Sequence, residues 1–301
     1  KKQSPITSSD RALSSTSTKL HHRMVQAFQR IQHTAMPDMP HENELQNTQN
    51  IVPRAFSGVD RLYGNGSYES LKNASVFIVG IGGVGSWAAE AIARNGIRNI
   101  SIIDLDNVAE SNINRQIQAV QATLGMAKVD ALAERIRSIN PECNVTRIEE
   151  FLTPENITDL LAVRPDVVLD CTDQTAAKVS MALHCHRHDL ALFMAGAAGG
   201  RADPTRIRRG DLADTQGDRL LSRVRALLRK SGEDGWPGKE GFHIEAVYSS
   251  EPMRRPHVDA CDSGGAMLQG LSCAGYGSSV CVTGSFGFAL AACAIEHLLK
   301  R

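Results

Sequence analysis

The chain lacks the cysteine patterns that would tie it to a disulfide-stabilised secreted fold. Its seven cysteines are odd in number and scattered, and no two of them stand in the spacing Cys-x-x-Cys. This pattern favours reduced thiols over a disulfide framework. One cluster of metal-ligand types exists, His184-Cys-His186-Arg-His188, but its alternating spacing would spread the side chains around a helix. We therefore expect a partly exposed helix end there, with a metal site as the less favoured alternative.

An excess of charge of either sign is also missing, because 33 basic residues balance 33 acidic ones. Without net positive charge, any binding to nucleic acid must come from local patches. Long apolar runs are absent as well, and we expect no segment to approach the roughly 20 residues that span a bilayer. The length of 301 residues and the hydrophobic content of 42% fit a soluble globular enzyme.

Residues 1–50 differ in composition from the rest of the chain. They are rich in Ser, Thr, Gln, His and Asn, with almost no acid before Asp38, and the sequence begins without Met. These features favour a fragment or a processed product with a disordered extension. An acid-poor N-terminus of this kind is also typical of organelle transit peptides. The expected location is cytoplasmic, or mitochondrial or plastid if the segment is a transit peptide.

From Arg54 onward, short apolar runs alternate with helical patterns. This alternation predicts an α/β fold with a doubly wound, mostly parallel sheet and a Rossmann-like nucleotide-binding half. Residues 51–301 are expected to form one domain, with a C-terminal irregular and helical extension at 201–301 that faces the substrate. Residues 252–272 are expected to be a mobile loop. Strands are predicted at residues 76–79, 100–104, 145–148, 167–170, 190–194 and 246–249, and helices at 86–94, 128–139, 181–188, 218–230 and 284–299.

The most informative segment is Val76-Phe-Ile-Val-Gly80-Ile-Gly82-Gly83-Val-Gly85-Ser. An apolar run, a glycine-rich turn and an alanine-rich helix begin a nucleotide-binding βαβ unit. Gly80 and Gly82 would permit a tight turn and close approach of the backbone to phosphate, and Gly85 would let the next helix pack onto the strand. Asp104, at the end of the next strand, is placed to accept ribose hydroxyls. The pattern predicts a nucleotide and leaves NAD and ATP open.

The loop after the second predicted strand separates these two nucleotides. Arg115 and Lys128 can supply positive charge at a phosphate under attack, which a dehydrogenase does not need. Ser111, Asn112 and Asn114 can orient sugar and phosphate oxygens. The alternative is an ordinary polar loop followed by a surface lysine.

A second discriminating feature is Asp170-Cys-Thr-Asp173-Gln174, at the carboxyl end of the apolar fourth strand. Open α/β sheets bind their ligands at that edge. A carboxylate that faces a triphosphate suits magnesium, and Asp173 is the predicted ligand because it lies beyond the strand. Asp170 is expected to turn back into hydrogen bonds at the strand end.

Taken together, these motifs resemble the adenylating superfamily, which includes ubiquitin-activating-type enzymes and the ThiF-type adenylyltransferases of thiamine and molybdopterin synthesis. Within it, the chain is most similar to the tRNA threonylcarbamoyladenosine dehydratases, from about Arg54 to the C-terminus. The resemblance rests on Arg61-Leu-Tyr-Gly64, Gly80-Ile-Gly-Gly-Val-Gly85-Ser-Trp, Asp104-Leu-Asp106, Asn112-Ile-Asn-Arg115-Gln, Ile139-Asn-Pro-Glu-Cys143, Asp170-Cys-Thr-Asp173, Gly196-Ala-Ala-Gly-Gly200-Arg-Ala-Asp203-Pro204-Thr205 and Thr283-Gly-Ser-Phe-Gly-Phe.

The resemblance implies roles for individual residues. By it, Asp104 binds ribose, Arg115 and Lys128 contact the phosphates of ATP, and Asp173 helps to hold magnesium. Arg61 resembles an arginine that reaches across a homodimer interface into the partner's ATP site. A monovalent cation and a sulfur-relay protein are further partners that the resemblance suggests.

Two departures from the superfamily pattern stand out. Gln174 stands where the superfamily often has Asn, which leaves its contact with the nucleotide open. Residues 252–272 align with nothing securely, except that Cys261 matches a loop cysteine of some relatives.

The implied reaction is the ATP-dependent dehydration of N6-threonylcarbamoyladenosine in the tRNA anticodon loop. The threonyl carboxylate would attack the α-phosphate of ATP, and the neighbouring carbamoyl group would then displace AMP and close a ring. Such chemistry needs positioning and neutralisation of charge rather than a protein nucleophile.

Two other functions stay open at this point. The chain could adenylate the C-terminus of a ubiquitin-like sulfur-carrier protein, although such relatives commonly carry two Cys-x-x-Cys pairs that this chain lacks. It could also be an NAD-dependent oxidoreductase. A cluster of basic residues favours RNA, with a solvated helix face as the alternative. Its members are Arg201, Arg206, Arg208, Arg209, Arg219, Arg223, Arg225, Arg229 and Lys230.

Overall fold

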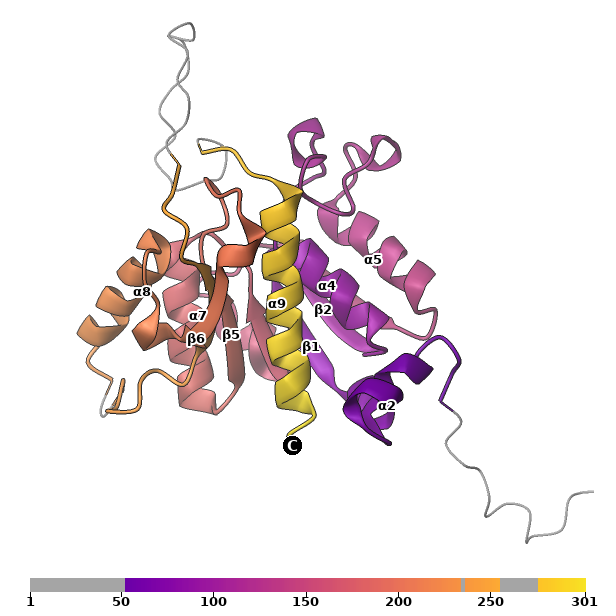
Figure 1. The fold of residues 1–301 in the computed structure, drawn as a ribbon, viewed down its shortest axis with the longest axis horizontal. Helices are drawn as coiled ribbons and strands as arrows, with labels where there is room; N and C mark the ends of the chain where they lie inside the picture. Colours follow the sequence, from indigo (N-terminus) through magenta and orange to yellow (C-terminus); the bar gives the residue numbers. More distant parts are fainter. Residues whose placement is uncertain (1–51, 234–235, 255–275) are drawn as a thin grey trace, which may run out of the picture. The chain divides into compact units, whose positions relative to one another are not determined.

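The computed structural model describes residues 52–233, 236–254 and 276–301. At the centre of this part of the chain is a seven-stranded β-sheet. The strand order is β3-β2-β1-β4-β5-β7-β6, and neighbouring strands are parallel except for the antiparallel pair β6–β7. The predicted doubly wound, mostly parallel fold is thereby confirmed (Figure 1). The strands are β1 (Ser75–Val79), β2 (Asn99–Ile103), β3 (Asn144–Ile148), β4 (Val167–Asp170), β5 (Ala191–Ala195), β6 (Ile207–Asp211) and β7 (Glu245–Ser249).

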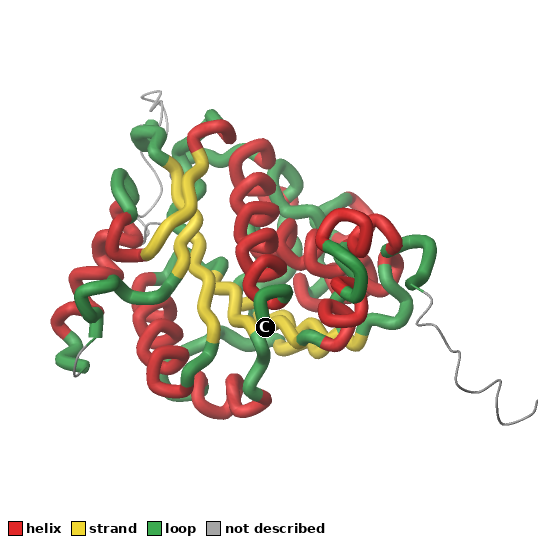
Figure 2. The backbone as a smooth tube through the Cα atoms, turned by 60° about the horizontal axis from the view of Figure 1, so that its bottom comes forward, coloured by secondary structure: helices red, strands yellow, loops and turns green. Residues whose placement is uncertain are grey.

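Helices cover both faces of this sheet, as Figure 2 shows. They are α2 (Ser57–Tyr63), α3 (Ser67–Asn73), α4 (Gly85–Arg94), α5 (Lys128–Ile139), α6 (Ile157–Leu160), α7 (Thr175–His188), α8 (Arg219–Lys230) and α9 (Val280–Leu298).

Strand β1 shows why the sheet needs two helical layers. Its side chains alternate between the two faces, as the pleat requires, and all of those after Ser75 are buried. Val76 and Ile78 belong to one hydrophobic cluster together with residues of α4, α5 and α9. Phe77 and Val79 belong to a second cluster, with residues of α7 and α8. A strand that is apolar on both faces must therefore lie in the middle of the sheet.

Helix α9 is long and apolar enough to cross a membrane by length and composition alone. No apolar segment of this length was expected from the sequence, but a single helix of this kind is weak evidence for a membrane span, because a core helix meets the same criteria. The helix packs along α4 and the sheet (Figure 1), and its residues Phe286 and Leu290 are fully buried. Its apolar composition is that of a core helix of this fold.

Several element boundaries differ from the predicted ones. Helix α7 begins at Thr175 and α9 at Val280, each earlier than expected, and α2 and α3 were not predicted. Strand β6 was also missed, because as an edge strand of sequence Ile-Arg-Arg-Gly-Asp it has no apolar run. Residues 1–50, most of the loop at 252–272 and Cys261 lie outside the described residues, so the expectations about them stay predictions.

The close contact between the glycine turn and α4 generates a first test. A methyl group at Gly85 would lie 1.9 Å from the carbonyl oxygen of Gly80. We expect Gly85→Ala to lower the free energy of unfolding by about 1–3 kcal/mol, because the first turn of α4 must move away from the backbone of Gly80. Gly58→Ala is the matched control, since a methyl group there meets nothing closer than 3.8 Å within helix α2. Urea unfolding of both variants checks this, and equal stability would contradict it.

Candidate functional site

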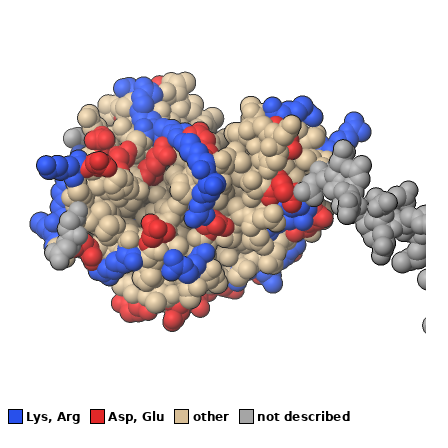
Figure 3. All heavy atoms as spheres, turned by 90° about the horizontal axis from the view of Figure 1, so that it is seen from below, with Lys and Arg blue, Asp and Glu red and all other residues tan. Residues whose placement is uncertain are grey.

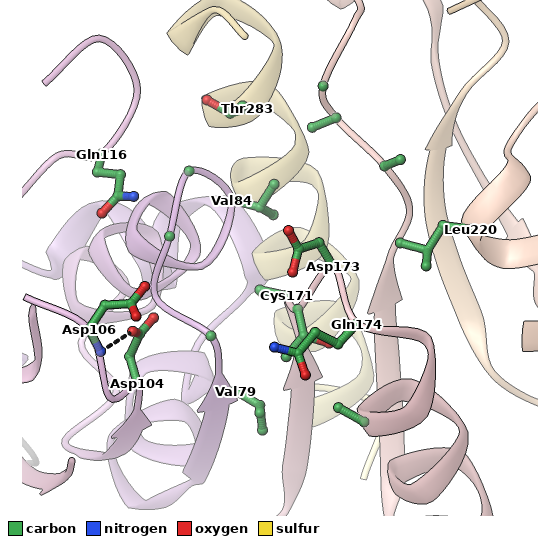
Figure 4. Close-up of a pocket in the computed structure, with 18 of the residues that line it drawn as sticks. Val79, Val84, Asp104, Asp106, Gln116, Cys171, Asp173, Gln174, Leu220 and Thr283 are labelled. Atoms are coloured by element: carbon green, nitrogen blue, oxygen red, sulfur yellow. Dashed lines mark hydrogen bonds between the residues drawn. The ribbon is translucent and has the colours of Figure 1, made fainter. Parts of the chain in front are cut away.

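A cavity of about 410 Å³ lies at the carboxyl ends of β1, β2, β4 and β5 (Figure 4). It is located where the strand order reverses: β2 and β3 extend the sheet on one side of β1, and β4 and β5 extend it on the other. Loops that leave two such strands diverge to opposite faces of the sheet and open a crevice between them. The cavity therefore occupies the position at which an open α/β sheet binds its ligand.

The glycine turn after β1 forms one wall of the cavity. Gly80 has a φ of +79°, in the left-handed region that glycine adopts without strain. Gly80, Gly82 and Gly83 line the cavity, whereas Gly85 begins α4 and does not line it. The wall is therefore mostly backbone, which allows close approach of a phosphate.

Asp104 attaches this turn to the end of β2. Its carboxylate accepts the backbone N–H of Ile81 at 2.9 Å and that of Asp106 at 3.0 Å. Burial raises the pKa of Asp104, while the Lys128 ammonium acts in the opposite direction. A carboxylate offers about four acceptor positions, so capacity for a ribose hydroxyl is left. Asp106 also lines the cavity and is the more exposed carboxylate, and the sequence analysis did not assign it.

Lys128 lines the cavity as the first residue of α5 and is only 5% exposed. Its Nζ lies 2.7 Å from the Asp106 carboxylate and 3.7 Å from that of Asp104. To contact a phosphate as expected, the Lys128 ammonium group must therefore bind the phosphate while it stays paired with the Asp106 carboxylate.

Arg115 lines the same wall and is held by its own loop. Its Nη1 donates to the Ser111 carbonyl at 2.7 Å and to Asn114 Oδ1 at 3.0 Å. Asn114 donates in turn to the Ser278 carbonyl, just before α9. Ser111 and Asn114 do not line the cavity, whereas Asn112 does and is buried. Two of the residues expected to orient ligand oxygens thus orient the arginine instead.

The two aspartates after β4 have different surroundings. Asp170 is fully buried, and its Oδ1 accepts the N–H and the hydroxyl of Thr172, as expected for a strand-end carboxylate. The Lys178 ammonium lies 3.1 Å from Asp170 and donates to the Ala195 carbonyl at the end of β5. Asp173 is exposed on the cavity wall, as Figure 4 shows.

The side chains available as metal ligands show whether the cavity suits the expected magnesium ion. No three His, Cys, Asp or Glu side chains gather as a metal site within the described part of the chain. Magnesium usually keeps several waters and takes one or two carboxylates together with phosphate oxygens, a mode that the single carboxylate of Asp173 fits. The alternative metal site is not supported, because the rings of His184 and His188 stack on each other and that of His186 stacks on Trp236.

Cys171 is the one described cysteine on the cavity wall. Burial raises its pKa, so the thiol stays protonated and is a poor nucleophile. Burial likewise raises the pKa of Cys185 and of Cys293 to about 12. These thiols agree with a reaction that proceeds without attack by a cysteine.

Arg61 does not line the cavity of its own chain. It is exposed on α2, where its Nη1 donates to the Ser57 hydroxyl at 3.2 Å. Helix α2 is followed by α3, which leads into the amino end of β1, whereas the cavity lies at the carboxyl end. The prediction that Arg61 serves a partner's site therefore stays a prediction.

The cavity wall includes residues that the sequence analysis did not assign. The segment 196–199 follows β5 at the carboxyl edge, so the rule for open sheets could have identified it. Three more are close sequence neighbours of predicted residues: Asp106, Gln116 and Thr172. The others come from distant loops and helices that only the fold brings together, and of these Arg219 was named beforehand as a member of the basic cluster and Thr283 as part of a family motif. They are Glu150, Phe151, Leu152, Arg219, Leu220, Met253, Tyr276 and Thr283.

Residues 57–300 match the model of the ThiF family. The chain is a member of the ThiF family. It is 40% identical over 248 residues to the tRNA threonylcarbamoyladenosine dehydratase of Haemophilus influenzae, covering 82% of this chain and 94% of the relative. The structure of the Escherichia coli tRNA N6-threonylcarbamoyladenosine dehydratase in complex with ATP is similar, with a TM-score of 0.73 and 37% identity over 82% of this chain and 94% of that one.

Members of the ThiF family with another substrate are more distant from this chain. The molybdopterin-synthase adenylyltransferase of Haemophilus influenzae is 32% identical over 165 residues, which cover 54% of this chain and 63% of that protein. The similarity to the Haemophilus influenzae dehydratase is therefore both higher and more extensive, and it extends into the C-terminal third of the chain.

The buried ion pair behind the cavity generates a second test. Lys178→Met would leave the Asp170 carboxylate buried with no cation, and its Oδ2 already has no hydrogen-bond partner. We expect a loss of about 3–5 kcal/mol in the free energy of unfolding. Adding Asp170→Asn should recover part of that loss, because the unpaired charge is gone. Urea unfolding of the single and double variants measures this coupling, and a single variant as stable as the wild type would contradict it.

Proposed function

We propose that this chain catalyses the ATP-dependent dehydration of N6-threonylcarbamoyladenosine in tRNA, with a carboxyl-adenylate as the intermediate. The observation that carries the proposal is the joint presence, on one cavity, of the glycine turn, Arg115, Lys128 and Asp173. The similarity to dehydratases over 82% of the chain supports the choice of substrate.

The cavity supplies what the first step of this reaction needs. The threonyl carboxylate attacks the α-phosphorus of ATP, a phosphorus–oxygen bond forms, and pyrophosphate leaves. Arg115 is placed to offset the charge that develops on the phosphate oxygens, and the glycine turn lets the backbone approach them. In the second step the carbamoyl group attacks the activated carbonyl carbon and loses a proton, and AMP leaves with one oxygen of the original carboxylate. The mass of the nucleoside thereby falls by that of one water.

Magnesium would be held by Asp173 together with phosphate oxygens. When bound, the ion supplies positive charge that stabilises the pyrophosphate leaving group. The Asp173 carboxylate is exposed on the cavity wall between the turn after β1 and the segment after β5, so it can reach such an ion without unfolding its loop.

The substrate-facing part of the domain is proposed to contact RNA through exposed cations. Figure 3, a view from below, shows the face opposite the cavity, where basic and acidic residues are interspersed over the described part of the chain. Several basic residues of the predicted cluster interact within the protein, and in three of them the guanidinium group is buried or partly buried or is held by ion pairs: Arg201 is buried, Arg209 pairs with Glu245 and Glu296, and the partly buried Arg225 donates to the Thr215 carbonyl. The remaining exposed cations are Arg206, Arg208, Arg219, Arg223, Arg229 and Lys230.

Adenylation of a sulfur-carrier protein is the second candidate. It shares the first chemical step and the nucleotide site, so the cavity alone does not separate the two substrates. The absence of any Cys-x-x-Cys pair from the sequence and the lower similarity to the molybdopterin relative disfavour it. The NAD-dependent alternative is disfavoured because the ThiF family match covers residues 57–300.

A direct assay tests the substrate. We expect tRNA that carries threonylcarbamoyladenosine to lose one water per modified nucleoside when incubated with the protein, ATP and magnesium, as measured by mass analysis of its nucleosides. Arg115→Ala should lower kcat by about 10²–10³-fold, because one donor to the developing charge is removed. Pyrophosphate exchange that depends on a carrier protein, with no change in the mass of the tRNA nucleoside, would contradict the proposal.

The proposed homodimer, in which Arg61 serves the partner's cavity, has a test of its own. Arg61→Ala and Lys128→Ala are each expected to be inactive as homodimers. A purified hybrid dimer of the two should regain activity, because its Arg61→Ala subunit has an intact cavity and a partner with Arg61. A hybrid as inactive as its parents would show that Arg61 does not act across the interface. Light scattering on each preparation establishes that dimers are present.

A further inference from the structure

One cationic side chain on the cavity wall, that of Arg219, has no role in the two chemical steps of the proposed reaction. Three basic side chains line the cavity: Arg115, Lys128 and Arg219. Arg115 is bound to its own loop, and Lys128 is bound to Asp106. Arg219 is exposed, and none of the hydrogen bonds or ion pairs within the described residues involves its guanidinium group. Its charge is therefore available to a ligand.

Arg219 belongs to the wall opposite the ribose end. Figure 4 places Leu220, the next residue of α8, across the cavity from Asp104 and Asp106, with Asp173 between the two sides. If ATP occupies the side of the glycine turn, an arginine on the α8 side is positioned for the second substrate. This step rests on the proposed function.

The wall around Arg219 is mostly apolar, with Tyr276, beside Gly200, as a further polar side chain. The segment Gly196-Ala-Ala-Gly199 contributes only small side chains without donors, and Leu220 is 2% exposed. An anion that enters between this segment and α8 would find its charged partner in Arg219. A guanidinium group suits carboxylate and phosphate oxygens equally, because it can donate two parallel hydrogen bonds to either.

A buried network holds the beginning of α8 against this wall. The Asp218 carboxylate accepts the N–H of Ala197 at 2.8 Å and that of Leu221 at 3.0 Å. The Arg201 guanidinium lies 3.6 Å from Asp218, and both side chains are fully buried. Arg201 also donates to the carbonyls of Ala197 and Ser249, each at 2.9 Å. The backbone on either side of Arg219 is therefore held by Asp218, which binds both the first turn of α8 and the cavity wall at Ala197.

We propose that Arg219 selects the RNA substrate by binding an anionic group of it at the α8 side of the cavity. It is a specificity-determining residue, and it does not contribute to the binding of ATP. Two sources can supply that anion, the threonyl carboxylate of the modified adenosine and a backbone phosphate beside it.

The test compares Arg219→Ala with Arg223→Ala in the full-length protein. Arg223 is one turn further along α8, exposed and a member of the same basic cluster, but it does not line the cavity, so it is the control for a peripheral RNA contact outside the site. Anticodon stem-loop RNAs with and without threonylcarbamoyladenosine are titrated in the presence of a non-hydrolysable ATP analogue, and kcat/KM is measured on the modified tRNA. Arg219→Lys, which keeps the charge, shows whether charge alone restores binding.

We expect Arg219→Ala to lower kcat/KM for tRNA by about 10- to 100-fold, the range for one hydrogen-bonded charged contact. Arg223→Ala should lower it by less than about 3-fold, as for an exposed contact that salt screens. Weaker binding of the modified RNA alone assigns the anion to the carboxylate, and equally weaker binding of both RNAs assigns it to a phosphate. Either result supports the proposal.

Three results would overturn it. The first is an Arg219→Ala protein that binds both RNAs as tightly as Arg223→Ala does. The second is a fall in ATP affinity by the same factor as the fall in RNA affinity, which would place Arg219 in the nucleotide site. The third is a melting temperature lowered enough to account for the loss, with Arg219→Lys equally impaired. Failure of the proposed function itself is distinguishable, because the wild-type protein would then bind neither RNA, and the modified nucleoside would keep its mass.

Discussion

The reversal of strand order between β1 and β4 is the constraint on which the rest of the structure depends. Parallel strands need long connections, and those that leave β1 and β4 run to opposite faces of the sheet. The carboxyl ends of these two strands are therefore left uncovered. The glycine turn and the segment after Asp170 form the two sides of this opening, and the cavity walls are built outward from there.

The walls are held by buried charges rather than by apolar contacts alone. Asp104 binds the turn after β1, the pair Asp170–Lys178 joins the ends of β4 and β5, and the pair Asp218–Arg201 joins the segment after β5 to α8. Burying such charges costs solvation energy, which their hydrogen bonds must offset. In return each group accepts or donates at defined backbone positions, so the loops around the cavity keep their geometry.

Much of the site could be predicted because it is local in sequence. Gly80, Gly82 and Gly83 form one turn, Asp104 follows β2 directly, and Asp173 lies in the loop just after β4. Residues in such positions reach the carboxyl edge of a sheet whatever the rest of the chain does. Strand β6 and the boundaries of α7 and α9 were harder to predict, because edge burial and helix capping depend on neighbours that sequence periodicity does not reveal.

The sequence by itself determined the nucleotide-binding unit, the alternation of strands and helices, and the set of charges that distinguishes ATP from a dinucleotide. Tertiary structure decided which of those charges are available. Lys128 is neutralised by Asp106, Ser111 and Asn114 hold Arg115, and Arg219 arrives at the cavity from a helix more than 100 residues beyond the glycine turn. The physical reason is that a motif specifies the conformation of one loop. Whether a side chain faces a ligand or another residue depends on the segments that pack against it.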